Sequence, residues 1–315
     1  MRRVVGLALV LVGAFLLGSA AMSRFYLPDR LVVTPIDQFA QTDAVGPGTY
    51  LDLGSLTEKS SDLVARRTLR GDVKASSDDV AVWDVSVVLQ TGTGEFNRAS
   101  VDRVATDRRT AEAVACCGEA VDGEPVRHSG VSYKFPFNAE KRDYAWWDAN
   151  TRRAAPAKFV SEERVKGLTV YKYIQTVPAF ELRTQALPGS LLGETAPTVQ
   201  APVYFQTTRT AWVEPRTGII IKANEQNLTT FRNSAGQDKV TFLRYDLTFD
   251  DATQGRQAKL ANDSISQIRL LTLWLPLLGL VLGLLLIAAG IVILRADRPA
   301  AHRAARDEEP EPATS

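Results

Sequence analysis

Two long apolar runs bracket the chain. Residues 270–294 contain no charged side chain, and residues 4–22 contain none either. A helix that rises about 1.5 Å per residue crosses a hydrocarbon core of about 30 Å in about 20 residues. Both runs therefore predict membrane-spanning helices. For residues 4–22 a second interpretation stays open, because a basic start, an apolar stretch and small residues are also typical of a cleaved signal peptide.

Arginines beside the two runs predict how the chain is oriented. Arg2 and Arg3 precede the first run, and four arginines follow the second: Arg295, Arg298, Arg303 and Arg306. Basic residues favour the cytoplasmic side of a membrane. We therefore expect residues 1–3 and a disordered tail at 295–315 in the cytoplasm. The domain at 23–269 is then extracytoplasmic, at the cell (plasma) membrane.

Alternation of apolar and polar positions dominates residues 23–269. In 81–89 every odd position is apolar, whereas Asp84 and Ser86 occupy even positions. A period of two is typical of a strand with one buried face. The same reasoning predicts strands at 131–137, 169–177 and 240–249, and a hairpin whose strands 207–213 and 219–225 flank a turn.

Helical signals in this domain are fewer. Pro156 suits the first turn of a helix over 156–165, and Asp250 with Asp251 caps a second helix over 252–269. The prolines and glycines of 187–202 predict a long loop. The whole pattern predicts a mainly β (β-rich α+β) extracytoplasmic domain flanked by two transmembrane α-helices.

The charge balance excludes one class of function. The chain carries 37 basic and 36 acidic side chains, so no excess of positive charge points to nucleic acid. The two cysteines, Cys116 and Cys117, are adjacent. Neighbouring Cα atoms lie about 3.8 Å apart, closer than in most disulfides. A strained vicinal disulfide, two partly buried thiols, and a bond from one thiol to another chain are the alternatives.

Residue patterns for catalysis or cofactor binding are lacking in the sequence. His128 lies in PVRHSG, which predicts a surface loop, and no spacing of Cys, His and carboxylates predicts a zinc site. No glycine motif for nucleotides occurs, and the adjacent Glu162 and Glu163 predict a solvated face. We therefore expect a protein that is not an enzyme and that uses no metal or cofactor. An uncharacterised hydrolase that uses carboxylates is the last-ranked alternative.

Aromatic side chains are concentrated in residues 133–148, which contain two Tyr, two Phe and two Trp. Packing in a hydrophobic core is the simplest role for such residues. On a strand, however, Trp146 and Trp147 would point to opposite faces, so one of them would be free to line a cavity or a partner surface. Tyr144, Trp146 and Trp147 are therefore the candidate ligand-facing side chains.

That aromatic stretch, YKFPFNAEKRDYAWWD, resembles part of an actinobacterial family known as "porin PorA", formerly a domain of unknown function. Residues 159–173 (FVSEERVKGLTVYKY), residues 210–218 (TAWVEPRTG) and the two flanking apolar runs are similar to the same family. The resemblance covers nearly the whole chain up to the second run. It implies a cell-envelope protein of a high-GC Gram-positive bacterium, and it offers no site residues.

These observations lead to a functional expectation. The chain is a non-enzymatic envelope membrane protein of the PorA-like family, in contact with membrane lipid, whose outer domain binds or conducts a ligand or supports a pore. A hydrophobic ligand such as a lipid is one candidate, because the layout of the chain resembles that of the animal scavenger receptors that conduct lipids. Two helices cannot enclose a wide pore, so a pore requires a homo-oligomer. A scaffold that organises other envelope proteins is the alternative.

Overall fold

The computed structural model describes residues 1–26, 30 and 32–296. These residues fall into two compact units: one contains the long apolar helices, and the other is Val32–Ile265. Apart from its first two positions, the predicted tail at 295–315 lies outside the described residues. The elements are α1 (Arg2–Phe25), β1 (Phe39–Asp52), β2 (Thr57–Gly71), β3 (Val80–Thr91), β4 (Asn97–Asp107), β5 (Ala120–Val121), β6 (Glu124–Pro125), β7 (Tyr144–Asp148), β8 (Arg153–Val165), β9 (Leu168–Pro188), η1 (Gly189–Leu192), β10 (Thr198–Val213), β11 (Ile220–Arg232), β12 (Asp238–Phe249), α3 (Asp251–Arg269), η2 (Leu270–Trp274) and α4 (Leu275–Ala296).

Both apolar runs are helical, as the sequence predicts. The first run forms α1, and the second belongs to a longer helix, Asp251–Ala296, in which η2 is a π-helical turn between α3 and α4. Each of these two helices is long and apolar enough to cross a bilayer.

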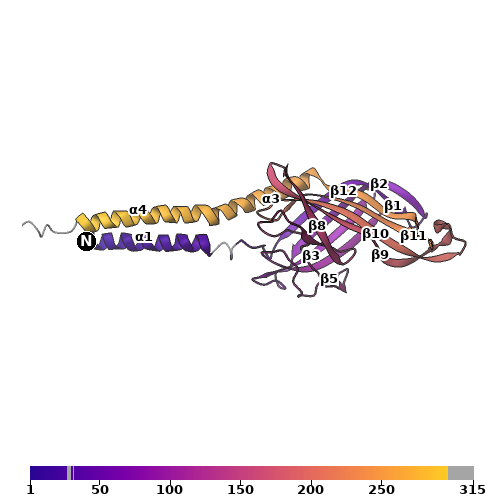
Figure 1. The fold of residues 1–315 in the computed structure, drawn as a ribbon, viewed down its shortest axis with the longest axis horizontal. Coiled ribbons are helices and arrows are strands. Elements are labelled where there is room, and N and C mark those ends of the chain that lie inside the picture. Colours follow the sequence, from indigo (N-terminus) through magenta and orange to yellow (C-terminus); the bar gives the residue numbers. More distant parts are fainter. Residues whose placement is uncertain (27–29, 31, 297–315) are drawn as a thin grey trace, which may run out of the picture. The chain divides into compact units, whose positions relative to one another are not determined.

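α1 and α4 lie side by side (Figure 1) and meet along small residues. Gly6, Gly13 and Ala20 are the buried positions of α1, and Gly283 and Gly290 are buried in α4. A Cβ atom added to Gly13 would lie 2.6 Å from the carbonyl oxygen of Gly283. The two backbones therefore approach too closely for a larger residue, which is typical of helix pairs in membranes.

The second unit is built on one twelve-stranded antiparallel sheet. Its strand order is β6-β5-β4-β3-β2-β1-β12-β11-β10-β9-β8-β7, so the first and last strands of the chain, β1 and β12, pair in the middle. The sheet curls on itself (Figure 1). Single bridges from Thr106 to Ala113, from Glu112 to Val131 and from Val131 to Trp146 connect β4 with β7. One face of the sheet therefore encloses an interior.

The strands predicted at 81–89, 169–177 and 240–249 are confirmed within β3, β9 and β12, and the hairpin is confirmed as β10 and β11. The helix predicted at 252–269 is also confirmed. Its cap is Asp250, whose Oδ1 accepts a hydrogen bond from the Thr253 N–H at 2.7 Å. Ala258 of α3 packs in a core cluster with Trp212 of the sheet, so tertiary packing supports the helix.

The helix predicted at 156–165 is wrong, because these residues belong to β8. From Pro156 onward, exposed and less exposed positions alternate along the strand. The sequence hides this alternation because Glu163 occupies an inward-facing position, where its Oε2 accepts a hydrogen bond from Trp212 Nε1 at 2.7 Å. A charged residue at a half-exposed position on the less exposed face breaks the apolar period that a strand would otherwise show.

The strand predicted at 131–137 is also wrong: only Val131 forms a bridge, and the rest is irregular. Pro136 cannot donate to a ladder. The segment instead binds the β10–β11 turn through its backbone, since the Phe135 N–H donates to the Gly218 carbonyl at 2.9 Å and the Ala139 N–H donates to the Pro215 carbonyl at 2.7 Å. Phe135 is fully buried, so the segment packs into one end of the interior.

The loop predicted at 187–202 is much shorter than expected. β9 reaches Pro188, η1 follows, and β10 begins at Thr198. Leu187, Leu192 and Ala201 belong to one buried cluster with Phe231. Burial of these apolar side chains therefore outweighs the proline and glycine signals in the same stretch.

Candidate functional site

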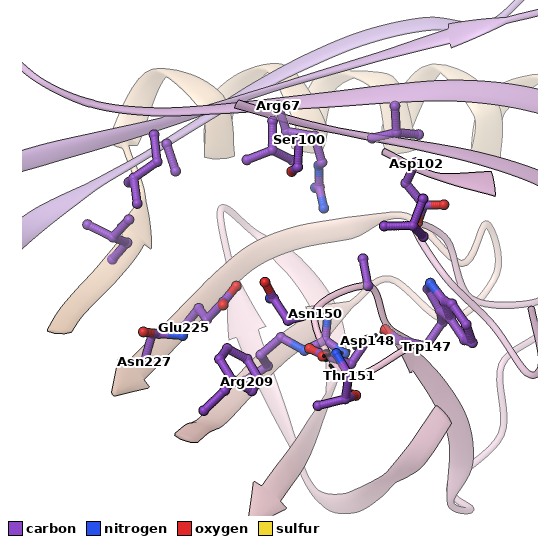
Figure 2. Close-up of a pocket in the computed structure, with 18 of the residues that line it drawn as sticks. Arg67, Ser100, Asp102, Trp147, Asp148, Asn150, Thr151, Arg209, Glu225 and Asn227 are labelled. Carbon is purple, nitrogen blue, oxygen red and sulfur yellow. Dashed lines mark hydrogen bonds and ion pairs between the residues drawn. The ribbon is translucent and has the colours of Figure 1, made fainter. Parts of the chain in front are cut away.

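The enclosed face of the sheet leaves a cavity of about 590 Å³. Its wall comes from β1–β4, from β9–β12 and from residues 146–152. Apolar side chains alternate on this wall with charged and hydrogen-bonding ones. The lining residues labelled in Figure 2 are Arg67, Ser100, Asp102, Trp147, Asp148, Asn150, Thr151, Arg209, Glu225 and Asn227.

Arg209 on β10 is held in the wall by several partners. Its Nε donates to Gln175 Oε1 at 2.8 Å, and its Nη2 donates to the Trp147 carbonyl oxygen at 2.6 Å. Asp148 Oδ2 lies 3.8 Å from the same Nη2. The Trp146 ring lies 4.3 Å from Arg209 Cζ, which is close enough for a cation–π contact. This guanidinium is therefore a fixed part of the wall.

Glu225 on β11 brings a carboxyl group to the same wall. It accepts a hydrogen bond from the Tyr245 hydroxyl at 2.8 Å. Burial raises the pKa of Glu225, although the charge of Arg209 and the hydrogen bond from Tyr245 act in the opposite direction. Burial also raises the pKa of Tyr245 well above its ordinary value, so the hydroxyl stays protonated and keeps donating.

Arg67 on β2 enters the cavity from the side that faces Arg209 and Glu225 (Figure 2). Its Cζ lies 5.5 Å from the centre of the Tyr133 ring and 5.7 Å from that of Phe249. Within the described part of the chain, its guanidinium has no hydrogen-bond or ion-pair partner. Burial lowers the pKa of Arg67, yet an arginine stays charged near neutral pH. A positive charge that is in no ion pair with the described residues therefore faces the cavity.

His128 is buried, so its prediction as a surface-loop residue is wrong. Its Nε2 lies 2.7 Å from Asp102 Oδ1, and its Nδ1 lies 3.0 Å from Glu119 Oε2. Asp102 also accepts a hydrogen bond from the Tyr133 hydroxyl at 2.6 Å. Burial acts to lower the pKa of His128, but the hydrogen bonds and charges of Asp102 and Glu119 outweigh it and raise the pKa. The sequence misses this cluster because Asp102 lies on β4 whereas Glu119, His128 and Tyr133 lie outside the strands that follow it, so that only the folded chain brings them together.

The imidazole of His128 is fully engaged by its neighbours. Carboxylates occupy both ring nitrogens of His128, so neither nitrogen is placed to activate a hydroxyl group or a water. Among the residues that the structure describes, no three His, Cys or carboxylate side chains are grouped to hold a metal ion.

The three candidate aromatic residues have different surroundings. Trp146 and Trp147 both line the cavity, whereas Tyr144 does not and packs on Phe135 in the core. Trp146 belongs to the same core cluster. Trp147 lies on the other side of β7, with its ring centre 4.3 Å from that of His128. Because successive side chains of a strand point to opposite faces, the two indoles lie on opposite sides of β7.

Cys116 and Cys117 do not line the cavity. The structure joins their sulfur atoms in a disulfide, and Cys117 has a φ of 67°. Arg103 Nε donates to the Cys117 carbonyl oxygen at 3.1 Å. We propose that the protein carries this bond. Alkylation before reduction, followed by mass spectrometry, is then expected to label neither thiol, and labelling of both would refute the bond.

Sequence patterns did not single out Arg67, Arg209 or Glu225. The sequence nevertheless contains a pattern that places Arg67 on the buried face of β2. Leu63 and Leu69 are buried and lie four and two residues from Arg67, and residues an even number of positions apart share one face of a strand. A charged residue in phase with buried apolar ones indicates a polar interior. That signal could not be assigned from the sequence alone, because nothing there shows which face of β2 is enclosed.

Comparison with known proteins agrees with this architecture. The family described as "Porin PorA" matches residues 5–292. A protein named Porin PorA from Corynebacterium amycolatum is 25% identical over an alignment that covers 93% of this chain and 99% of that protein. A protein of the same name from Corynebacterium resistens is 23% identical over an alignment that covers 96% of this chain and 99% of that protein. The chain belongs to the porin PorA family.

Proposed function

We propose that this chain is a non-enzymatic membrane protein of the cell envelope, and that its β domain takes up a small polar solute during passage of that solute through the envelope. The observation that supports this most directly is the cavity of about 590 Å³ inside the curled sheet, with charged side chains on its wall. A volume of this size suits a small molecule.

The chemistry of the wall favours a polar solute over an acyl chain. Arg67, Arg209 and Glu225 all line the cavity. An acyl chain in contact with these groups would remove their hydration without offering a hydrogen bond, which costs free energy. A polar solute replaces that hydration with its own donors and acceptors.

Two further features support a role in the membrane. The relatives above carry the name porin, and this chain has two helices that are long and apolar enough to span a bilayer. Because α1 packs against α4 at Gly13 and Gly283, we propose that α1 is retained as an anchor rather than cleaved. Two helices cannot enclose a water-filled path, so we propose that several copies assemble around it.

Planar-bilayer recording of the purified full-length chain tests this function. Wild type is expected to give stepwise conductance. Ser100 lines the cavity, and Ser100→Phe is expected to reduce the conductance by at least about half because the ring fills space in the path. Ala99 is its exposed neighbour and does not line the cavity, so Ala99→Phe is the matched control and is expected to conduct like wild type.

Two results would contradict the proposal. Wild-type protein that gives no conductance at any concentration would show that the chain does not form a pore. Equal conductance in wild type, Ser100→Phe and Ala99→Phe would show that the path does not pass through the β domain's interior.

A further inference from the structure

The two arginines of the cavity differ in how their charges are satisfied. Arg209 binds Gln175 and the Trp147 backbone and lies close to Asp148. Arg67 has no hydrogen-bond or ion-pair partner among residues 1–26, 30 and 32–296. One of the two guanidinium groups is therefore part of the wall, and the other is available.

Neighbouring side chains position Arg67 without using its N–H groups. The rings of Tyr133 and Phe249 lie near its Cζ, and a ring face attracts a cation but accepts no strong hydrogen bond. Glu225 attracts Arg67 across the cavity, but the two groups form no ion pair, and the carboxyl group of Glu225 already accepts from Tyr245. A guanidinium has five donors in a planar fork, and none of the five has an acceptor among the described residues.

A planar fork of donors selects a particular ligand chemistry. Carboxylate and phosphoryl groups present pairs of oxygen atoms whose spacing matches a guanidinium, and such pairs form short, charge-assisted hydrogen bonds. The low dielectric of an enclosed site strengthens these bonds. A neutral ligand of the same shape would gain much less from the same arginine.

We propose that Arg67 is the recognition residue of an interior oxyanion site, which binds the carboxylate or phosphoryl group of a small solute in the cavity that Figure 2 shows. This inference rests on the proposed uptake of a solute by the β domain, and it names the chemical class of that solute. The remaining wall, with Trp146, Trp147 and Asn227, is left for the rest of the solute.

Isothermal titration of the detergent-solubilised full-length chain with benzoate, inorganic phosphate and benzyl alcohol tests the site. At least one of the two oxyanions is expected to bind wild type saturably, and benzyl alcohol, the neutral analogue of benzoate, is expected to bind more weakly than benzoate. Arg67→Gln is expected to weaken oxyanion binding at least about tenfold, because the charge-assisted hydrogen bonds of the guanidinium are lost.

Arg70→Gln is the matched control for charge. Arg70 lies on the same strand, is exposed and does not line the cavity, so this variant loses the same charge from the outer face and is expected to bind like wild type. Thermal unfolding in anion-poor buffer shows whether Arg67→Gln is folded. Its melting temperature is expected to be no lower than that of wild type, because the substitution removes a partly buried charge that no ion pair in the described part of the chain stabilises.

Each outcome separates this inference from the proposed function. The oxyanion site is wrong if neither benzoate nor phosphate binds wild type. It is also wrong if benzoate and benzyl alcohol both bind wild type and Arg67→Gln equally. In either case, conductance that depends on Ser100 would still support solute passage.

Discussion

At the scale of single residues, the β domain keeps charged groups in its interior in two ways. Arg209 and His128 each have several hydrogen-bond partners, whereas in the described part of the chain the guanidinium of Arg67 has two aromatic rings as its partners. Removing one member of a buried group of paired charges leaves the other members unpaired. The loss in stability is then larger than the net stability that the intact group contributes. The two kinds of residue are therefore expected to respond in opposite ways to neutral substitution.

His128→Gln is expected to lower the free energy of unfolding by about 3 kcal/mol near pH 6, because Asp102 and Glu119 would then repel each other without a cation between them. The pKa of His128 is raised in the folded chain above its ordinary value of 6.5. A raised pKa means that the folded state binds the proton more tightly. The contribution of His128 is therefore complete below pH 6.5 and is lost as the pH rises through the folded pKa.

Guanidinium unfolding of the full-length chain, repeated across this pH range, measures that difference. Arg127→Gln is the control, since Arg127 is 79% exposed and lies 3.7 Å from Glu119, and an exposed pair contributes at most about 1 kcal/mol. A difference between wild type and His128→Gln that grows with rising pH would contradict the raised pKa.

At the scale of elements, backbone contacts explain both what the sequence predicted and what it missed. The alternation in 240–249 predicted β12 correctly, because Leu243 and Leu247 face the interior and Arg244 faces solvent. The segment 131–137 shows a similar alternation, yet its N–H groups have scattered acceptors: Val131 donates to the Ala145 carbonyl of β7, whereas Phe135 donates to the Gly218 carbonyl in the β10–β11 turn. Period alone does not reveal which partner accepts those hydrogen bonds.

Gly218→Ala is expected to destabilise the chain more than Gly236→Ala does, by at least about 2 kcal/mol. Both glycines end β-hairpin turns with positive φ, 71° and 74°, so both substitutions carry the cost of a left-handed conformation. A Cβ atom at Gly218 would also lie 1.9 Å from the Phe135 carbonyl oxygen, whereas one at Gly236 meets nothing within 4 Å. Displacement of the segment that holds Phe135 would open one end of the interior.

Thermal and denaturant unfolding of the two variants give the comparison directly, and Gly236→Ala supplies the cost of the backbone conformation alone. Equal losses in both variants would show that the contact between the turn and Phe135 contributes nothing to stability. In that case the hydrogen bonds between the segment 131–139 and the β10–β11 turn would not hold the end of the interior closed.

At the scale of the whole molecule, the sequence shows the two apolar helices clearly and the cavity not at all. A spanning helix is encoded in one continuous stretch, such as 270–294, so composition is enough to find it. Arg209 and Glu225 face each other across the β10–β11 hairpin, whereas Arg67 comes from β2, far away along the chain. Only the strand order, with β1 paired to β12, brings these strands around one interior.

The predicted orientation places the β11–β12 turn outside the cell and both chain ends in the cytoplasm. Gly236→Cys in that turn is expected to react with a membrane-impermeant maleimide in intact cells, because Gly236 is exposed. Thr314→Cys is expected to react only after the membrane is permeabilised, since the arginines after residue 294 favour the cytoplasmic side. Both variants are made with Cys116→Ser and Cys117→Ser, so that no native thiol reacts.

The two positions test different parts of the orientation. Labelling of Gly236→Cys in intact cells without labelling of Thr314→Cys requires the chain to cross the membrane between them, and α4 is the described helix with the length and hydropathy to do so. Labelling of both positions in intact cells would mean that the second apolar run does not span. Labelling of Thr314→Cys alone would invert the orientation, and the β domain would then have to receive its solute from the cytoplasm.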